Sequence, residues 1–465
     1  MPITSQQLDA ALSHADANLP GSLERLRALV AIKSISTDPA YAAECRRAAD
    51  WLVADLRSEG FADAAARPTP GHPVVVAHGP KVEGPTAVFY AHYDVQPVDP
   101  LDLWKTDPFA LAEQRQPSGE THLVGRGTSD DKGQLLTFVE ACRALRAATG
   151  TLPINVTFCL EGEEESGSKN LAPFLAATKD DLKADVALVC DTDLLNPTTP
   201  SITTMLRGLV GEEIEITCAA MDLHSGMYGN AARNPNQVLA DIIASLRNPD
   251  GSVAIAGFYD DVAELDPITA ESWSKLGFDG DAYLRNVGLT TPAGENNRSV
   301  LEQTVSRPTC EINGMIGGYT GEGFKTVIPA KASAKISFRL VSNMDPDKIR
   351  AAFRQHVRDR LPPDATVTFK QHGGSRAVSV PTTGPYLQRA RDALTAEWGN
   401  EAALRGSGGS IPVAGDFKTI LGLDTLLIGF ANSDDRIHSP NEKYNLTSYR
   451  KGIRSWIRIL AALAG

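Results

Sequence analysis

Histidine and carboxylate residues that could bind a metal ion follow an apolar segment near the start of this sequence. His92 and Asp94 lie at the end of residues 87–95, AVFYAHYDV. Two residues apart on an extended chain, their side chains project to the same side. A carboxylate commonly orients a metal-bound imidazole through its other ring nitrogen. Alone, this His-x-Asp pair also fits an ordinary turn at a strand end, so the interpretation depends on further residues.

More candidate ligands follow other apolar segments. Asp130 precedes a helical pattern in GRGTSDDKG, where an aspartate also fits a simple helix cap. An acidic cluster follows residues 156–160, Asp191 follows residues 186–190, and His438 comes shortly after residues 426–430. A run of charge is usually a solvated surface, but gathering several carboxylates at one place is costly unless cations compensate. Their recurrence after strands indicates one metal site.

The number of these side chains predicts two divalent ions. Two histidines and several carboxylates exceed the ligands of one tetrahedral zinc ion. Two ions about 3.5–4 Å apart, bridged by a carboxylate, hold a shared hydroxide and polarise a carbonyl. Of two adjacent glutamates, one would bind metal and the other would act as general base for the water. Zinc is the expected metal, with manganese or cobalt as alternatives, because carboxylate-rich sites accept all three.

The elements around these residues predict a three-layer α/β domain. Short apolar runs occur at residues 74–77, 87–90, 154–160 and 186–190, and a helical pattern spans residues 134–147. Apolar runs separated by helices are typical of a largely parallel central sheet covered on both faces. Ligands of such sheets gather beyond the carboxyl ends of the strands, which is where the candidate ligands stand.

A second domain is expected within the first. Residues 213–218 and 334–340 alternate polar and apolar side chains, and helical patterns occur at residues 236–246 and 347–357. This predicts an α+β domain with one exposed sheet face. A helix from Pro385, an apolar run at 426–430 and a final helix at 449–463 then restore the α/β pattern. We therefore expect a catalytic domain of residues 1–206 and 380–465 and an inserted domain of residues 207–379.

Composition limits the partners and the location. The chain has 465 residues, with 45 Lys and Arg against 57 Asp and Glu, and no long basic run, so nucleic acid is not an expected partner. Its six cysteines form no CxxC pair and lie mostly in apolar runs, as buried thiols of a reducing compartment do. No signal-like N-terminal segment and no run of about 18 apolar residues is present. We expect a cytoplasmic protein without a membrane partner.

The ordered motifs of the chain resemble those of the co-catalytic zinc exopeptidases. The motifs are AHYDVQP, GRGTSDDKG, LEGEEESGS, CD, DLHSG, KTVIP, GGSIP and IHSPNEK. This family includes carnosinase-type cytosolic dipeptidases, glutamate carboxypeptidase, acetylornithine deacetylase and succinyl-diaminopimelate desuccinylase. The likeness spans nearly the whole chain and is greatest to the dipeptidases. It implies that one metal ion is bound by His92, Asp130 and Asp191, and the other by Asp130, Glu165 and His438, with Asp130 as the bridge.

The same resemblance implies further roles. Glu164 would be the general base, Asp94 would brace His92, and the peptide bond from Asp130 to Asp131 would be cis. The inserted domain would be a lid that also forms the homodimer, in which His224 reaches the partner subunit's site and stabilises the oxyanion. Four positions match residues that hold the C-terminal end of the substrate: Thr326, Arg339, His372 and Ser410.

The expected activity is hydrolysis of the amide bond of dipeptides or related small amides that carry a carboxylate. The alternative within this chemistry is an N-acyl amino acid deacylase of the acetylornithine deacetylase or desuccinylase type. A non-catalytic metal-binding scaffold is the alternative from another class. Two assignments stay open, because Glu163 is a third glutamate in the acidic cluster and Asp193 is a rival to Asp191.

Overall fold

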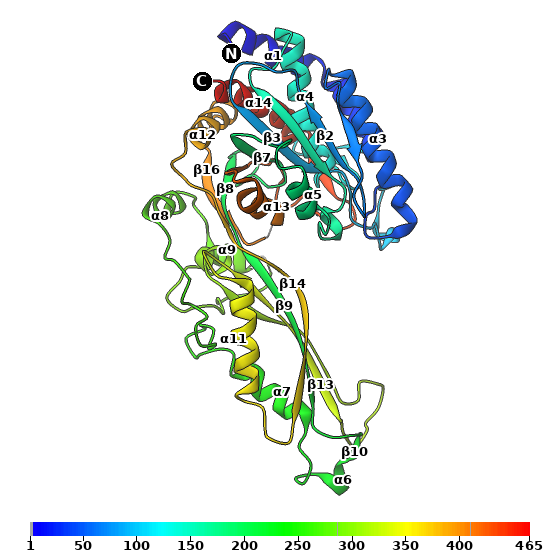
Figure 1. Ribbon diagram of the computed structural model, residues 1–465, viewed down its shortest axis with the longest axis vertical. Coiled ribbons are helices and arrows are strands. Elements are labelled where there is room, and N and C mark those ends of the chain that lie inside the picture. Colours follow the sequence, from blue (N-terminus) through cyan, green and yellow to red (C-terminus); the bar gives the residue numbers. More distant parts are fainter. Residues whose placement is uncertain (1–2, 286, 410) are drawn as a thin grey trace. The chain divides into compact units, whose positions relative to one another are not determined.

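The computed structural model describes residues 3–285, 287–409 and 411–465, which divide into two compact units (Figure 1). Unit 1 comprises Met1–Thr204, Val380–Arg405 and Asp416–Gly465, and unit 2 comprises Met205–Ser379 and Gly406–Gly415. The segment 406–415 was expected in the domain of residues 380–465, whereas its contacts group it with unit 2. None of the described helices is both long enough and apolar enough to cross a membrane.

The main sheet of unit 1 has parallel strands at its centre. The order β1-β2-β6-β3-β7-β17-β8 joins strands β1 (Ala65–Arg67), β2 (Val74–His78), β3 (Thr86–His92), β6 (Asn155–Glu161), β7 (Val186–Val189), β8 (Ser201–Leu206) and β17 (Thr425–Leu427). Strand β3 pairs in parallel with β6 and β7, and β7 pairs in parallel with β17. The outer pairs β1–β2, β2–β6 and β17–β8 are antiparallel. The expected mixed α/β domain with a largely parallel centre is confirmed.

Helices and short elements complete unit 1. The helices are α1 (Ser5–Ala17), α2 (Leu19–Val30), α3 (Ala42–Ser58), α4 (Lys132–Thr149), α5 (Leu171–Ala177), α12 (Pro385–Trp398) and α14 (Leu446–Leu463). A small antiparallel sheet contains β4 (Ala112–Arg115), β5 (Thr121–Val124) and β18 (Lys443–Asn445). Strand β16 (Ala403–Ser407) pairs with β8. The short helix η3 (Glu164–Ser166) follows β6 in the sequence, and the short helix η4 (Phe417–Leu421) precedes β17.

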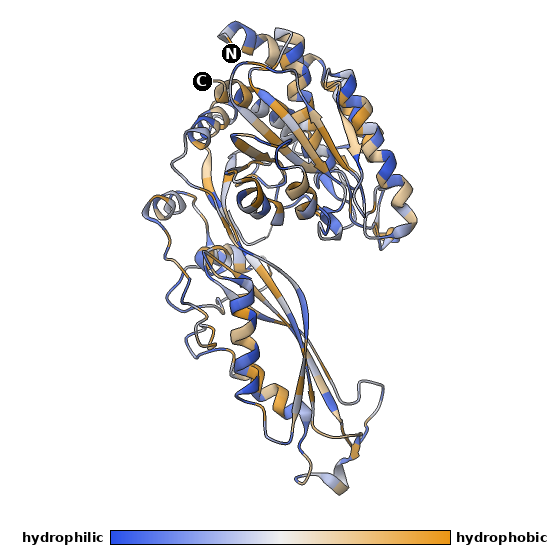
Figure 2. Cartoon of the chain, in the orientation of Figure 1, coloured by the Kyte–Doolittle hydropathy of each residue, from blue (hydrophilic) through white to orange (hydrophobic). Residues whose placement is uncertain are grey.

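Two neighbouring residues of β3 show that helices cover both faces of this sheet. Phe89 stacks on Phe138 of α4 and meets Trp456 of α14 edge to face. Tyr90 meets Phe417 of η4 edge to face. Adjacent strand residues point to opposite faces, so α4 and α14 lie on one face and η4 lies on the other. The central strands are buried almost throughout, and Figure 2 shows hydrophobic residues along them and mixed colouring on the surrounding helices.

Unit 2 is built on an antiparallel sheet with one face covered by helices. The strand order is β11 (Thr309–Gly317), β13 (Lys331–Leu340), β9 (Gly208–Thr217) and β14 (Thr366–Ser375). Along β9, buried and half-buried residues alternate, which is the pattern of a strand with one face on a core. That core includes Ile214 and Phe338 of the sheet, Leu239 of α7 (Pro235–Ala244) and Phe353 of α11 (Pro346–Arg358). Residues 213–218 and 334–340 had predicted this arrangement.

Short elements surround the sheet of unit 2. Strand β10 (Leu223–His224) pairs with β12 (Val327–Ile328), and β15 (Val378–Ser379) pairs with residues Met205 and Leu206 of β8. The short helices are α6 (Ser225–Tyr228), α8 (Pro267–Ser274), α9 (Gly280–Arg285), α10 (Val300–Val305) and α13 (Pro412–Asp416). The last residue of α13, Asp416, is the first residue of the final segment of unit 1. These elements carry two of the candidate residues from the sequence, His224 and Thr326, on or beside β10 and β12.

Candidate metal centre

The carboxyl ends of three parallel strands of unit 1 meet at one edge of its sheet. His92, the last residue of β3, pairs in register with Glu161, the last residue of β6. Strand β7 ends at Val189, which pairs with Tyr90 of β3. The three strands therefore deliver His92, the acidic cluster after β6 and Asp191 after β7 to the same edge, as expected for a parallel sheet.

The first ligand group consists of His92, Asp130 and Asp191. One ligand atom of each lies within 4.8 Å of the others. The His92 Nε2 atom is 3.0 Å from Asp130 Oδ1. On the other side of the ring, His92 Nδ1 is 3.1 Å from the carbonyl oxygen of Asp94 and 3.4 Å from its Oδ1 atom. Asp94 therefore fixes the ring so that Nε2 faces the other two candidate ligands.

The second ligand group consists of Asp130, Glu165 and His438, again within 4.8 Å of one another. The His438 Nε2 atom is 2.9 Å from Asp130 Oδ2 and 3.2 Å from Glu165 Oε2. The two oxygens of Asp130 thus face different imidazoles, which is the geometry of a bridging carboxylate. The His438 side chain is 53% exposed, whereas those of Asp130 and Glu165 are nearly buried, so this end of the site opens to solvent.

The histidines and carboxylates of the site shift one another's pKa values. Burial would raise the pKa of Asp130, but bonds to His438 and His92 outweigh it and hold this pKa below its usual range. Bonds to Asp130 and Glu165 raise the pKa of His438 to about 10. The pKa of His92 lies well above normal, because bonds to Asp130 and Asp94 outweigh the effect of burial. Positive charge is therefore favoured beside these carboxylates, and a divalent cation would supply it with neutral imidazoles as ligands.

Glu164 lies beside the ligand groups without belonging to either. Burial raises its pKa to about 7, and the neighbouring charges of Glu165 and Asp130 add to this against the opposing effect of His92. A carboxyl group that titrates near neutral pH accepts and returns a proton under ordinary conditions, which is the requirement for a general base.

Two further side chains, Gln96 and Ser36, support the ligands and were not among the candidates from the sequence. The Gln96 Nε2 atom donates to Glu165 Oε2 at 2.8 Å. The Asp94 Oδ2 atom accepts from Ser36 Oγ at 2.5 Å and from the backbone N–H of Glu165 at 3.0 Å. Asp94 therefore holds a residue of each ligand group. Gln96 lies inside the motif AHYDVQP, and this position could have identified it as a residue of the site. Ser36 lies in none of the motifs, so nothing in the sequence pointed to it.

Glu442 is another supporting residue that was not among the candidates, although it lies inside the motif IHSPNEK. Its fully buried Oε1 atom accepts backbone N–H groups from Ser129 at 2.9 Å and Asp130 at 3.1 Å. Its Oε2 atom accepts from Gly127 N at 3.0 Å and from Arg126 Nη1 at 2.8 Å. Glu442 thus holds the loop that carries the bridging residue. The peptide bond after Asp130 is cis, as the resemblance implied.

The two rivals for ligand positions make other contacts. Both carboxylate oxygens of Glu163 accept from Asn170 Nδ2, at 3.1 and 2.9 Å. The Asp193 Oδ2 atom bonds to Arg405 Nη1 at 3.2 Å. In the part of the chain that the structure describes, neither residue joins a group of potential metal ligands.

The remaining candidate residues belong to unit 2. His224 is exposed and its Nδ1 atom accepts from Gly226 N at 3.0 Å, and the exposed Thr326 accepts from Ser225 N through its carbonyl oxygen. His372 lies on β14 with its Nε2 atom 3.3 Å from Glu213 Oε2. Arg339 lies on β13 and lines a cavity of unit 2. Ser410 falls outside the described residues.

The donor atoms of the two groups fit divalent transition metals. Imidazole nitrogen with carboxylate oxygen is a donor set that suits zinc, manganese and cobalt. The bracing of His92 by Asp94 and of Glu165 by Gln96 is the outer support that metal ligands usually have. Two three-residue groups with one shared carboxylate can hold two ions side by side.

Comparison with known proteins identifies relatives along almost the whole chain. A Cys-Gly metallodipeptidase of Schizosaccharomyces pombe is 31% identical over 456 residues, which cover 95% of each chain. A Beta-Ala-His dipeptidase of Rattus norvegicus is 30% identical, over 97% of this chain and 94% of the relative. The solved structure of the di-peptidase Dug1p from Saccharomyces cerevisiae superposes with a TM-score of 0.82 at 26% identity, covering 99% of both chains. The sequence pattern of Peptidase family M20/M25/M40 matches residues 88–462, and the chain therefore belongs to this family.

Proposed function

We propose that this protein is a metal-dependent dipeptidase that uses water activated between two divalent ions. The observation that carries the proposal is the position of Asp130, whose two oxygens face His92 and His438 at 3.0 and 2.9 Å. The metallodipeptidases among the relatives support dipeptides as substrates. They do not favour the alternative, an N-acyl amino acid deacylase.

In the proposed site, five side chains bind the metal ions. One ion is held by His92, Asp130 and Asp191, and the other by Asp130, Glu165 and His438. Two ions bound in this way supply a nucleophilic hydroxide at neutral pH and polarise the scissile carbonyl. Support for this set comes from the two groups of ligand atoms that lie within 4.8 Å and from the balance of charge that they require.

Glu164 is the proposed proton carrier. It removes a proton from the attacking water and returns it to the leaving amine, so that no free amide anion forms. Its pKa of about 7 suits both steps. Asp94 keeps the His92 ring and the Glu165 backbone in position. His224 of the partner subunit stabilises the oxyanion that forms when water adds to the carbonyl.

Arg339 is proposed to bind the terminal carboxylate of the substrate, because a guanidinium group matches a carboxylate through two parallel hydrogen bonds. The resemblance implies the same role for three more residues, Thr326, His372 and Ser410. A dipeptide with a free carboxylate would then bind better than its amide, and this distinguishes a peptidase that recognises the chain end from one that recognises only the scissile bond.

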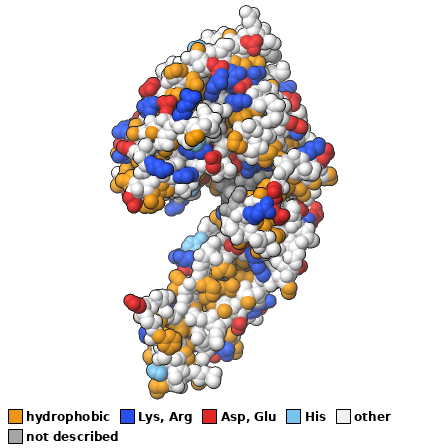
Figure 3. Space-filling view, turned by 180° about the vertical axis from the view of Figure 1, so that it is seen from behind, with side chains coloured by type: hydrophobic (Ala, Val, Ile, Leu, Met, Phe, Trp, Pro, Cys, Tyr) orange, Lys and Arg blue, Asp and Glu red, His pale blue; other side chains and the backbone are white. Residues whose placement is uncertain are grey.

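Unit 1 is the proposed catalytic domain, with zinc as its metal, and unit 2 the proposed lid and dimerisation domain. Figure 3 shows hydrophobic side chains gathered on unit 2. Exposed apolar residues of this unit include Ile312, Met315 and Ile316 on the outer strand β11, and Met227 and Phe324. A homodimer would cover them. All six cysteines are free, which supports a cytoplasmic location.

A panel of substrates tests this function directly. The purified protein should hydrolyse dipeptides with a free amine faster than N-acyl amino acids. Changing Glu164 to alanine should lower kcat by a factor of about 10² to 10⁴ and leave the metal content unchanged. Preference for acylated substrates would favour the deacylase, whereas full turnover by the variant would show that the base is wrongly assigned.

A further inference from the structure

The loop between β6 and α5 carries Glu164 and Glu165, and a buried hydrogen bond closes it. Glu161 is the last residue of β6 and is only 1% exposed. Its Oε1 atom accepts from Ser168 Oγ at 2.6 Å. The two ends of the loop are therefore joined across the segment that contains the proposed general base and one candidate metal ligand.

A second bond connects Glu161 to strand β3. The Glu161 Oε2 atom accepts from the hydroxyl group of Tyr90 at 2.9 Å, and Tyr90 is fully buried. Tyr90 and His92 are two residues apart on β3, so their side chains share one face of the sheet. His92 also pairs in register with Glu161. The carboxyl group of Glu161 thus links the loop to the strand that supplies a ligand of the first group.

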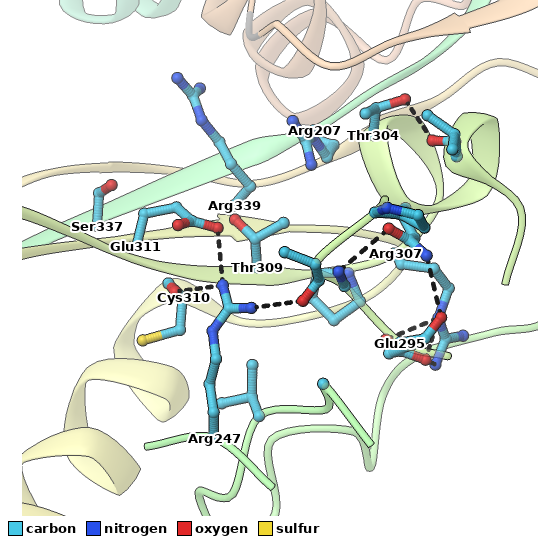
Figure 4. Close-up of a pocket in the computed structure, with 18 of the residues that line it drawn as sticks. Arg207, Arg247, Glu295, Thr304, Arg307, Thr309, Cys310, Glu311, Ser337 and Arg339 are labelled. Atoms are coloured by element: carbon cyan, nitrogen blue, oxygen red, sulfur yellow. Dashed lines mark hydrogen bonds and ion pairs between the residues drawn. The ribbon is translucent and has the colours of Figure 1, made fainter. Parts of the chain in front are cut away.

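The partners of Glu161 differ from those of other buried or nearly buried carboxylates. Glu442 Oε2 lies 2.8 Å from Arg126 Nη1. In the wall of a unit 2 cavity, Glu295 Oε2 lies 2.9 Å from Arg307 Nη2, a pair that Figure 4 shows. Glu161 instead accepts from two neutral hydroxyl groups. Burying a carboxyl group is costly, and the bonds of Glu161 offset this cost by holding two hydroxyl groups in place.

The backbone of Ser168 is strained. Its φ angle is +49°, in the left-handed region that favours glycine, and the preceding Gly167 has a φ angle of +92°. Such strain in a residue other than glycine persists where the surroundings hold it, commonly at functional sites. The backbone N–H of Ser168 donates to the carbonyl oxygen of Glu163 at 2.7 Å. The hydroxyl group, which glycine lacks, is the group that binds Glu161.

We propose that Glu161 and Ser168 are positioning residues, which set where the Glu164 carboxylate stands beside the metal centre. The proposal rests on the function proposed above, in which Glu164 carries the proton. With the loop closed at Ser168 and attached to Tyr90, Glu164 is held against the strand end that bears His92. A displacement of about 1 Å lowers turnover by up to about 10²-fold. Neither residue contacts the substrate in this scheme, so KM should change little.

Two substitutions at Ser168 test the role of its hydroxyl group. S168A removes the hydroxyl group, and S168G removes it in a residue that suits the left-handed backbone. Each should lower kcat for Ala-Gly by a factor of about 10 to 100, leave KM within about twofold of wild type and retain both zinc ions.

The matched control S166A removes another hydroxyl group of the same loop. Ser166 Oγ donates to the carbonyl oxygen of Glu163 at 3.2 Å, and this oxygen also accepts the backbone N–H groups of Ser166 and Ser168. The carbonyl oxygen therefore keeps partners when the Ser166 hydroxyl group is removed. S166A should keep kcat within about twofold of wild type.

Substitutions at Glu161 separate hydrogen bonding from charge. A hydroxyl group both donates and accepts, so the amide of E161Q can keep both bonds, whereas E161M keeps neither. We expect E161M to lose as much kcat as S168A, and E161Q to recover most of that loss, to within about fivefold of wild type. If E161Q loses as much as E161M, the charge of Glu161 is responsible and the proposal is wrong.

Hydrogen exchange of the zinc-loaded protein separates failure of this proposal from failure of the proposed function. Peptides that contain residues 161–170 should exchange faster in S168A and E161M than in the wild type, and at the wild-type rate in S166A. If the wild type cleaves no dipeptide but this pattern holds, the positioning of the loop stands and the dipeptidase function is wrong.

Three results would overturn the proposal. An active wild type with an unchanged kcat in S168A would show that the bond to Glu161 does not position Glu164. Loss of zinc from S168A would show that the bond serves metal binding. Full activity of S168G beside a loss in S168A would show that backbone strain, and not the missing hydroxyl group, causes the loss.

Discussion

Each oxygen of the Asp130 carboxylate faces a different imidazole, and this arrangement could be predicted only in part from the sequence. Asp130 stands before α4, where a helix cap is an equally good local explanation. His92 and Asp191 were identifiable because each directly follows an apolar strand. Their convergence depends on the parallel pairing of β3 with its neighbours, and pairing is a property of distant segments that no local pattern contains.

Glu442 lies inside the motif IHSPNEK, but the partners of its carboxylate could not be predicted from the sequence. Its carboxylate accepts N–H groups from Gly127, Ser129 and Asp130, which are more than 300 residues earlier in the chain. Backbone groups have no residue type, so nothing in the sequence marks them as partners of a glutamate. Glu163 shows the converse, because its place in the acidic cluster suggested a ligand but its contacts are with Asn170.

The titration of His356 provides a prediction about pH. Burial lowers the pKa of His356, the charge of Arg360 lowers it further, and its Nε2 atom lies 2.8 Å from Ser245 Oγ. The folded protein therefore resists protonation at a pH where the unfolded chain, with a usual pKa near 6.5, takes up a proton. This residue contributes its full stability above about pH 6.5, and that stability is lost as the pH falls toward the lowered pKa.

Replacing His356 with glutamine, which can keep a bond to Ser245, should make the free energy of unfolding less dependent on pH. Urea denaturation at pH 7.5 and pH 5.0 would measure the difference for both proteins. We expect a smaller difference in the variant. An equal loss of stability on acidification in both proteins would show that His356 is not protonated on unfolding.

At the scale of elements, local sequence patterns identified most helices and strands. The residues at which a strand begins and ends depend on the segments that pair with it. The strand expected at residues 426–430 ends at Leu427. A side chain at Gly429 would lie 2.0 Å from the carbonyl oxygen of Thr192, so the two backbones approach too closely there for a residue other than glycine. Strand β9 extends from Gly208, earlier than the predicted residue 213, because β13 pairs with it along its full length.

One buried carboxylate of β9 binds α11 in addition to their apolar contacts. Glu212 of β9 bonds to Arg350 Nε and Arg354 Nε of α11, each at 2.8 Å, and the glutamate is buried. Changing Glu212 to glutamine leaves the Arg350 charge without its main partner, and should reduce the free energy of unfolding of unit 2 by about 3 kcal/mol. Chemical denaturation followed by hydrogen exchange at peptides of unit 2 would measure this.

Glu215 on the same strand is the matched control. It pairs with Lys331 at 2.7 Å where both side chains are exposed. Exposed pairs contribute less than about 1 kcal/mol, so glutamine at this position should have little effect. If both substitutions lower the free energy of unfolding by the same amount, burial is not the reason that the Glu212 ion pairs stabilise unit 2.

At the scale of the whole molecule, the two-domain organisation was expected from a change of pattern near residue 207, whereas the grouping of Gly406–Gly415 with unit 2 was not. This segment lies between residues that belong to unit 1. The unit that this segment contacts is determined when the complete chain folds. The sequence pattern therefore cannot assign the segment to either unit.

The proposed homodimer is tested by sedimentation. Ile316 on the outer strand β11 is 62% exposed. Changing it to glutamate places a charge in the proposed interface, where its burial on association is unfavourable, and should turn the dimer into a monomer with reduced activity, because His224 of the partner subunit would be lost. The control Leu103→Glu changes a residue of unit 1 that is 58% exposed and should stay dimeric. A fully active monomer would contradict the role of His224.

Metal analysis of the purified, zinc-loaded protein tests the central claim most directly. The wild-type chain should bind two ions, and Asp130→Asn should lose both, because this residue belongs to both ligand groups. The matched control Glu163→Gln, which changes a carboxylate bonded to Asn170, should still bind two. One ion per wild-type chain, or two ions in the Asp130 variant, would contradict the account.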